Sequence, residues 1–268
     1  MVPAATRPPA VAGTFYPASP DALRRLIDRL LLGAEPAAEE PVPKALIVPH
    51  AGYVYSGAVA ASAYVRLRRA SESITRIVLL GPAHRVFVHG VVSPGVEVMQ
   101  TPLGDVDVDL DAIARVRTLH DDPEAHALEH SLEVQLPFLR RVVPNARVVP
   151  LAIGRATTEE VARVIDALWG GPETCVIVSS DLSHYLPYAN ATSLDRDTAE
   201  HIVAMDGLLP PVRACGYTGV NALIHVARRR HLHARVLDLR NSGDTAGETD
   251  AVVGYGAFGF YEEGEPCN

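Results

Sequence analysis

The sequence is poor in cysteine and tryptophan, with three of the former and one of the latter among its 268 residues. Cys175, Cys215 and Cys267 have no close spacing, and so few thiols in so long a chain do not make a disulfide framework. We therefore expect a reducing, cytoplasmic location. No apolar run reaches the ~20 residues that span a bilayer, and residues 1–20 lack the basic-then-apolar order of a signal peptide. We expect no membrane partner.

Basic residues are also scarce, since 24 Lys and Arg stand against 32 Asp and Glu, which gives a net charge of -8. Nucleic-acid binding needs a concentrated basic face. The nearest candidate is Arg228–Arg230, which is better placed to end a helix, where cations complement the helix dipole. We expect no nucleic-acid partner.

Several motifs of catalysis are missing. The chain has neither of the phosphate-binding loops GxGxxG and GxxxxGK[ST], nor the GxSxG turn of many serine hydrolases. His126 and His130 are four residues apart, but no glutamate follows His126, so this is not the HExxH motif of zinc proteases. Nucleotide-dependent and serine-hydrolase chemistry are therefore disfavoured.

What the chain does have is a regular alternation of two patterns. Strand-length apolar runs, typical of strands covered on both faces, alternate with stretches of helical period. The predicted strands are Ala45–Val48, Arg76–Leu80, Gly90–Ser93, Arg147–Ile153, Cys175–Ser179, Arg235–Leu239 and Val252–Phe260. The predicted helices are Asp21–Leu32, Gly57–Leu67, His130–Val142, Thr158–Leu168, Ser193–Ala204 and Gly219–Arg229. This alternation predicts an α/β fold.

The absence of a long polar linker favours a single domain. Residues 33–43, rich in Pro, Ala and Glu, are expected to be an exposed connection. These residues form the last part of an N-terminal arm and helix (residues 1–43). The core (residues 44–262) follows. A short tail (residues 263–268) follows.

Three predicted strands each run into a short turn and then a histidine: His50, His84 and His184. If these strands are parallel, their carboxyl ends meet at the edge where open α/β sheets bind ligands. A single histidine after a strand is more often a loop residue that hydrogen-bonds its own turn. Three in one chain favour a shared site, because neighbouring buried imidazoles need a metal or paired partners. Asp181 is a candidate acceptor that would orient one of the rings.

Cys215 precedes the helical run Val220–Arg229. A thiol near a helix N-terminus has a lowered pKa and can serve as a thiolate ligand or nucleophile. The alternative is a small buried hydrophobic residue, as most free cysteines are, and the position alone does not decide between the two. Cys175, in a core strand, and Cys267, in the tail, are expected to be inert.

The segment 126–133 carries His126, Glu129, His130 and Glu133. In a helix, the two histidines would share one face, and so would the two glutamates. The simpler interpretation is the polar start of a helix, which we adopt for His126. Glu129 and His130 remain candidates for the cleft.

The order of several short motifs resembles a known family. VAGTFYP (residues 11–17), PHAGY (49–53), GPAH (81–84), EHSLE (129–133), SSDLSH (179–184) and ACG (214–216) look like the successive motifs of the Memo family, whose bacterial and archaeal members are called AmmeMemoRadiSam system protein B. The resemblance extends from Val11 to Phe260, nearly the whole chain.

This resemblance implies a fold shared with class III extradiol dioxygenases of the LigB type, with a central mixed, largely parallel sheet flanked by helices on both faces. In those enzymes two histidines and a glutamate hold non-haem iron(II), and a further histidine acts as acid and base. Memo-like proteins have a similar pocket with cysteine in place of the glutamate. Carried onto this chain, the resemblance assigns His50, His84 and Cys215 as metal ligands. It assigns His184 as the acid–base residue, with Asp181 as its neighbour.

The cysteine changes what the fold implies. A triad of two histidines and one carboxylate leaves open positions for oxygen and a chelating catechol. A thiolate is softer, favours copper(I) or zinc as well as iron, and can be oxidised. Dioxygenase activity therefore does not transfer with the fold. The expected cofactor is iron(II), followed by copper and then zinc.

Two functions follow as expectations. The first is a metal-dependent oxidoreductase, dioxygenase-like in its site, that acts on an unknown small molecule in a pocket lined by Tyr53, Glu129 and His130. The second is a non-catalytic module that holds a peptide or a partner protein in the same cleft, with a radical SAM protein and a small companion protein of the same system as expected partners. A zinc hydrolase with Asp181 as the base is a weaker third alternative.

Overall fold

A computed structural model describes residues 5–36 and 40–262. Every strand predicted from the sequence is present in these residues, with ends shifted by a few positions at most. The predicted tail, residues 263–268, lies outside the described residues, and Cys267 with it.

The strands form two sheets in the described part of the chain. The larger sheet contains β2 (Ala45–Val48), β3 (Arg76–Pro82), β4 (Val91–Ser93), β7 (His120–Asp121), β8 (Arg147–Ile153), β9 (Thr174–Ser179), β10 (His184–Leu186), β11 (His233–Asn241) and β12 (Val252–Tyr261). Its order is β10-β12-β2-β9-β3-β8-β4-β7, with β11 paired to β12. The smaller sheet contains β1 (Thr6–Arg7), β5 (Val98–Thr101) and β6 (Gly104–Asp107).

The larger sheet is mixed. Its central strands β2, β9, β3 and β8 are parallel neighbours. β12 pairs antiparallel with β2, β10 and β11, and β4 pairs antiparallel with β8. The predicted α/β fold with a mixed sheet is confirmed, but the parallel part is confined to these four strands and the short β4–β7 pair. The four central strands therefore end at one common edge.

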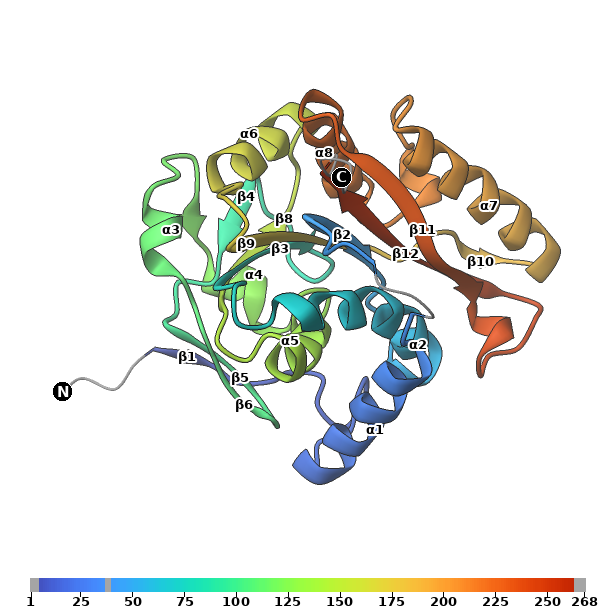
Figure 1. Ribbon diagram of the computed structural model, residues 1–268, viewed down its shortest axis with the longest axis horizontal. Coiled ribbons are helices and arrows are strands. Elements are labelled where there is room, and N and C mark those ends of the chain that lie inside the picture. Colours follow the sequence, from blue (N-terminus) through green and yellow to red (C-terminus); the bar gives the residue numbers. More distant parts are fainter. Residues whose placement is uncertain (1–4, 37–39, 263–268) are drawn as a thin grey trace, which may run out of the picture.

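Helices cover both faces of this sheet (Figure 1). On one face α1 (Pro20–Gly33), α2 (Tyr53–Tyr64) and α5 (Leu136–Val142) pack together, and on the other α6 (Thr158–Leu168) packs with α8 (Tyr217–Arg229). α7 (Tyr188–Ala204) lies against β11 and β12. The shorter helices are α3 (Leu110–Ala114), α4 (Pro123–Ala127) and the 3-10 helices η1 (Val65–Ala70), η2 (Glu133–Gln135), η3 (Pro211–Arg213) and η4 (Ser242–Asp244).

The predicted continuous helix over residues 130–142 is wrong. A turn is followed by η2 and then by α5. Pro137 lies in the first turn of α5, where its missing N–H costs nothing. Inside a longer helix, the same proline would remove a hydrogen bond and clash with the preceding turn. The Glu129 carboxylate also accepts the backbone N–H groups of His130 and Ser131, which holds them in the turn.

The N-terminal arm is fixed to this turn. β1 pairs with β5, and the buried guanidinium of Arg7 lies 2.8 Å from the buried carboxylate of Glu133. That carboxylate also accepts the backbone N–H groups of Ala10 and Val11 and the hydroxyl of Tyr16. The arm that follows β1 is therefore held against the segment that carries Glu129 and His130.

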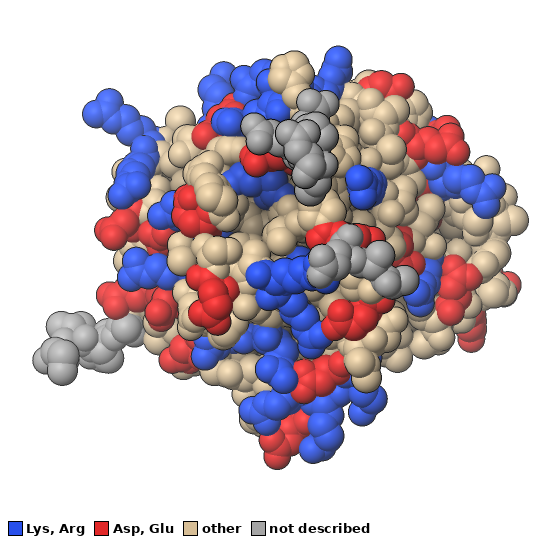
Figure 2. All heavy atoms as spheres, viewed as in Figure 1, with Lys and Arg blue, Asp and Glu red and all other residues tan. Residues whose placement is uncertain are grey.

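Charged side chains of both signs are interspersed on the face drawn in Figure 2. Partly exposed ion pairs of the described residues include Arg66–Glu40 and Arg141–Asp28. None of the helices in residues 5–36 and 40–262 combines the length and the apolar character that a bilayer span requires.

Candidate metal centre

The predicted histidines follow the ends of three neighbouring parallel strands. His50 lies two residues after β2, His84 lies two residues after β3, and His184 follows β9 and opens β10. A fourth histidine, His130, comes from the turn between α4 and η2. The common edge of the parallel strands thus brings together side chains that are far apart in the sequence.

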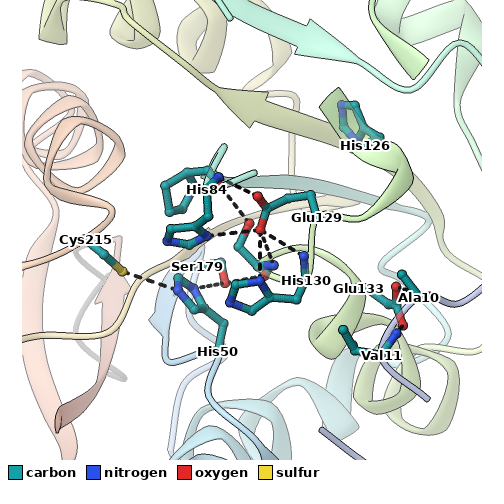
Figure 3. A network of polar contacts seen from close by, with 12 residues as sticks. Ala10, Val11, His50, His84, His126, Glu129, His130, Glu133, Ser179 and Cys215 are labelled. Atoms are coloured by element: carbon teal, nitrogen blue, oxygen red, sulfur yellow. Dashed lines mark hydrogen bonds and ion pairs between the residues drawn. The ribbon is translucent and has the colours of Figure 1, made fainter. Parts of the chain in front are cut away.

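Three of these histidines form a cluster. One nitrogen of each of His50, His84 and His130 lies within 4.8 Å of the others, a set that could hold a metal ion. Their ring centroids are 5.2 Å apart for His50–His84, 5.6 Å for His50–His130 and 4.9 Å for His84–His130. Figure 3 shows the three rings converging from separate segments. His130, expected only as a residue of the pocket, is a full member of the cluster.

Glu129 holds His84 in place. Its carboxylate accepts the backbone N–H of His84 at 2.5 Å and lies 3.0 Å from His84 Nδ1. Burial alone would raise the pKa of Glu129, but the hydrogen bonds from His84 and Ser131 lower it to about 2. An ionised carboxylate only accepts hydrogen bonds, so His84 Nδ1 carries a proton, and in the neutral ring Nε2 keeps its lone pair. Glu129 was expected to line the pocket; it lies buried behind His84 instead.

His50 is buried at the floor of the site. Its Nδ1 lies 2.9 Å from Ser179 Oγ, and its Nε2 lies 3.3 Å from Cys215 Sγ. Burial, and after it the charge of His84, lowers the pKa of His50 to about 3. The ring is therefore neutral at physiological pH, which is the form that binds metals.

His130 has a buried nitrogen without a hydrogen-bond partner. Its Nδ1 lies 3.4 Å from Glu129 Oε1 but forms no hydrogen bond there or elsewhere. Burial, and after it His50, lowers the pKa of His130 to about 4. The ring of Phe15, from the N-terminal arm, lies 4.9 Å away. A buried nitrogen left without a hydrogen-bond partner is costly.

Cys215 lies beside the cluster rather than in it. Its Sγ accepts the backbone N–H of Asp181 at 3.3 Å and contacts His50, but it is not part of the three-histidine set. The prediction of a lowered thiol pKa is wrong for the protein without a metal. Burial, and after it the charge of Asp181, raises the pKa of Cys215 to about 12, although α8 begins two residues later.

Asp181 and His184 lie at the same edge. Asp181 Oδ1 accepts the backbone N–H of His50 at 2.7 Å, so it anchors the loop after β2 rather than an imidazole ring as predicted. Burial raises the pKa of Asp181. His184 Nδ1 lies 2.8 Å from the carbonyl oxygen of Leu182. A carbonyl only accepts, so His184 carries its proton on Nδ1 and keeps Nε2 free to take up another.

These groups open into a cleft of about 740 Å³. Its polar lining includes His50, His84, His130, Asp181, His184 and Cys215. Phe15, Tyr55, Tyr185 and Tyr255 supply aromatic walls. Tyr53, expected in the pocket, is buried in the core, where its hydroxyl donates to the carbonyl of Val134; Tyr55 lines the cleft in its place. Phe15 was not anticipated, because nothing in its local sequence shows that the arm folds back onto His130.

The family models and the curated proteins that match this chain point to one family. A family model described as "Memo-like protein" matches residues 7–258. A MEMO1 family protein of Caldivirga maquilingensis is 35% identical, covering 96% of this chain and 99% of its own. A MEMO1 family protein of Aquifex aeolicus is 34% identical, covering 93% and 97%, and one of Ignicoccus hospitalis is 37% identical, covering 95% and 98%. A solved structure of an uncharacterised Escherichia coli K12 protein superposes with a TM-score of 0.48 at 14% identity, over 80% of this chain and 98% of that one, which is too distant to bear on function.

Proposed function

Since this chain belongs to the Memo family, which it matches over residues 7–258, we propose that it is a metal-dependent redox protein acting on a small molecule in the histidine-lined cleft. The observation that carries the proposal is the cluster of His50, His84 and His130. Three imidazoles at the carboxyl edge of parallel strands, in a cleft large enough for a ligand, form an arrangement that binds metal ions more readily than it serves packing.

The donor atoms fit a metal ion. At metal–nitrogen bonds of about 2.0–2.1 Å, two nitrogens on one ion lie roughly 3–4 Å apart. Nitrogens that already lie within 4.8 Å of one another reach this separation by small side-chain rotations. The proton on His84 Nδ1 also suits a metal, because it leaves the lone pair of Nε2 available.

We assign His50 and His84 as ligands whichever metal ion is bound. His130 or Cys215 would supply the third ligand. Imidazole suits iron, copper and zinc, whereas a thiolate favours soft ions such as copper(I). Iron(II) is our first assignment, copper the second and zinc the third. Iron or copper, when bound, would supply one-electron chemistry, and each of the three ions would polarise a ligand beside it.

Residues of the chain would then accept a proton from the ligand in the cleft. His184, with Nδ1 bonded to a carbonyl, keeps Nε2 available to take up a proton from a ligand in the cleft. Asp181 holds the backbone N–H of His50, which fixes the loop that carries this ligand. Phe15 and Tyr55 line the same cleft.

A second candidate function has one observation in its favour. The cleft has an apolar rim: Val54 is 65% exposed, Tyr185 77% and Val212 67%. Exposed apolar side chains around a cleft are typical of surfaces that hold a peptide or a partner protein. The alternative is therefore a non-catalytic module that binds a peptide, or the radical SAM and companion proteins of the AmmeMemoRadiSam system. It predicts equal capture of these partners by wild type and His50→Ala.

Metal analysis tests the first proposal. Protein purified without oxygen and reconstituted with iron(II) or copper(I) should retain about one ion per chain, and His50→Ala and His84→Ala should lose it. His201→Ala is the matched control, because His201 is a partly exposed histidine of α7. Equal, negligible metal in wild type and variants would refute the proposal. Because a thiolate is a softer ligand than an imidazole, we further expect His130→Ala to weaken iron(II) binding and Cys215→Ser to weaken copper(I) binding.

A further inference from the structure

Ser179, at the end of β9, makes three hydrogen bonds that together fix the direction of its hydroxyl proton. Its wholly buried Oγ lies 2.6 Å from the carbonyl oxygen of Ser131, 2.8 Å from Gln135 Nε2 and 2.9 Å from His50 Nδ1. A carbonyl oxygen only accepts hydrogen bonds, so the single hydroxyl proton of Ser179 points to Ser131. Oγ must accept from its other two partners.

The orientation of the Gln135 side-chain amide is fixed independently. Gln135 Oε1 lies 2.8 Å from the hydroxyl of Tyr64, while Nε2 lies 3.0 Å from the carbonyl oxygen of Pro49 as well as 2.8 Å from Ser179. Flipping the amide would place an oxygen against the Pro49 carbonyl, with two acceptors facing each other. The amide therefore donates to Ser179, and Tyr64 anchors this arrangement in the core.

His50 must then donate its Nδ1 proton to the one remaining lone pair on Ser179 Oγ. In a neutral imidazole, a proton on Nδ1 leaves the lone pair on Nε2. Nε2 is the nitrogen that faces Cys215, at 3.3 Å from its Sγ. The tautomer of His50 is thus set by hydrogen bonds that reach from the core to the site.

We infer that Ser179, held by Gln135, is a positioning residue that selects the His50 tautomer with Nε2 free for the metal. This inference rests on the proposed function, because the free Nε2 matters only if an ion binds there. Glu129 fixes the His84 tautomer by an independent carboxylate contact. The short segment 129–135 therefore organises both rings, through Glu129 on one side and through Ser131 and Gln135 on the other.

The tautomer can be read directly from the metal-free wild-type protein. Long-range proton–nitrogen NMR correlations of the histidine rings distinguish a proton on Nδ1 from one on Nε2. We expect Nδ1–H at His50 in wild type, and loss of this single form in Ser179→Ala. Nε2–H at His50 in wild type, or an unchanged Nδ1–H form in Ser179→Ala, would overturn the inference. The wild-type spectrum decides even if the variant does not fold.

Cobalt(II) titration supplies the second readout. Losing an outer hydrogen-bond partner of a metal-binding histidine typically lowers metal affinity about 10–100-fold. We expect that loss in Ser179→Ala, recovery in Ser179→Thr, which keeps the hydroxyl, and no loss in Ser93→Ala. Ser93 is an equally buried serine of β4 and bonds Asp121 away from the cluster.

The two readouts separate failure of the inference from failure of the proposed function. Wild-type protein that binds no cobalt(II), iron(II) or copper(I) refutes the metal site itself. Wild-type protein that binds cobalt(II) but shows Nε2–H at His50 refutes only the role of Ser179. Unchanged cobalt(II) affinity in a folded Ser179→Ala variant also refutes that role.

Discussion

Replacing Glu133 with glutamine should destabilise the protein strongly. The carboxylate is wholly buried and accepts hydrogen bonds from Arg7, from the backbone of Ala10 and Val11, and from Tyr16. Glutamine turns one acceptor into a donor that faces donors, and it leaves the Arg7 charge buried without a counter-ion. Breaking a buried pair in this way costs about 3–5 kcal/mol. For a chain of this size, that loss corresponds to a fall in melting temperature of roughly 6–20 °C.

Chemical denaturation and thermal melting of three variants measure this effect. Glu133→Gln should lose the full amount. Arg7→Met should also destabilise the protein, because it leaves the Glu133 carboxylate buried without its counter-ion and the carbonyl oxygens of His126 and Glu129 without their donor. Glu40→Gln is the control: its pair with Arg66 is partly exposed and should contribute less than about 1 kcal/mol. A loss below about 1 kcal/mol for Glu133→Gln, or an Arg7→Met variant as stable as wild type, would refute the reasoning.

Three further predictions concern other parts of the molecule. Burial lowers the pKa of His126 from 6.5 to about 4, so about 3 kcal/mol of stability is present above pH 6.5 and lost as the pH falls toward 4. The urea midpoint of His126→Gln should therefore fall less steeply over this window than that of wild type, and parallel curves would contradict it. Glu129→Gln should weaken cobalt(II) binding about 10–100-fold in a titration, because His84 loses its carboxylate; unchanged affinity would refute this role. Gly254→Ala should cost about 1–3 kcal/mol in thermal melting, since its Cβ would overlap the carboxylate of Asp195, which two hydrogen bonds from Ser183 hold in place. A melting temperature equal to that of wild type would contradict it.

Local signals account for much of the fold. The helix Thr158–Leu168 was predicted with its observed bounds, and the structure shows why it begins there: Thr157 and Glu160 form a capping box. The antiparallel partners of β12 left no comparable signal, since apolar runs show that a strand is buried and not which way its neighbour runs. The break before Pro137 could have been predicted, because a proline eight positions into a helix is itself a warning.

The candidate site was predictable only where the ends of the predicted strands pointed to it. Strand ends pointed to His50 and His84, because parallel strands place their carboxyl ends together. Tyr53 was misplaced, since it begins α2 facing the core, and Tyr55 lies on the side of the helix that faces the cleft. The roles of Ser179 and Gln135 depend on long-range hydrogen bonds, and no spacing in the sequence reveals them.

An anomalous-diffraction map of crystals grown without oxygen and reconstituted with iron(II) tests the central claim most directly. Data collected on both sides of the iron absorption edge locate the ion and identify it. The account predicts one peak between the rings of His50, His84 and His130, with His50 Nε2 and His84 Nε2 among the bound atoms. No peak in the cluster, or a peak bound through His50 Nδ1, would contradict it.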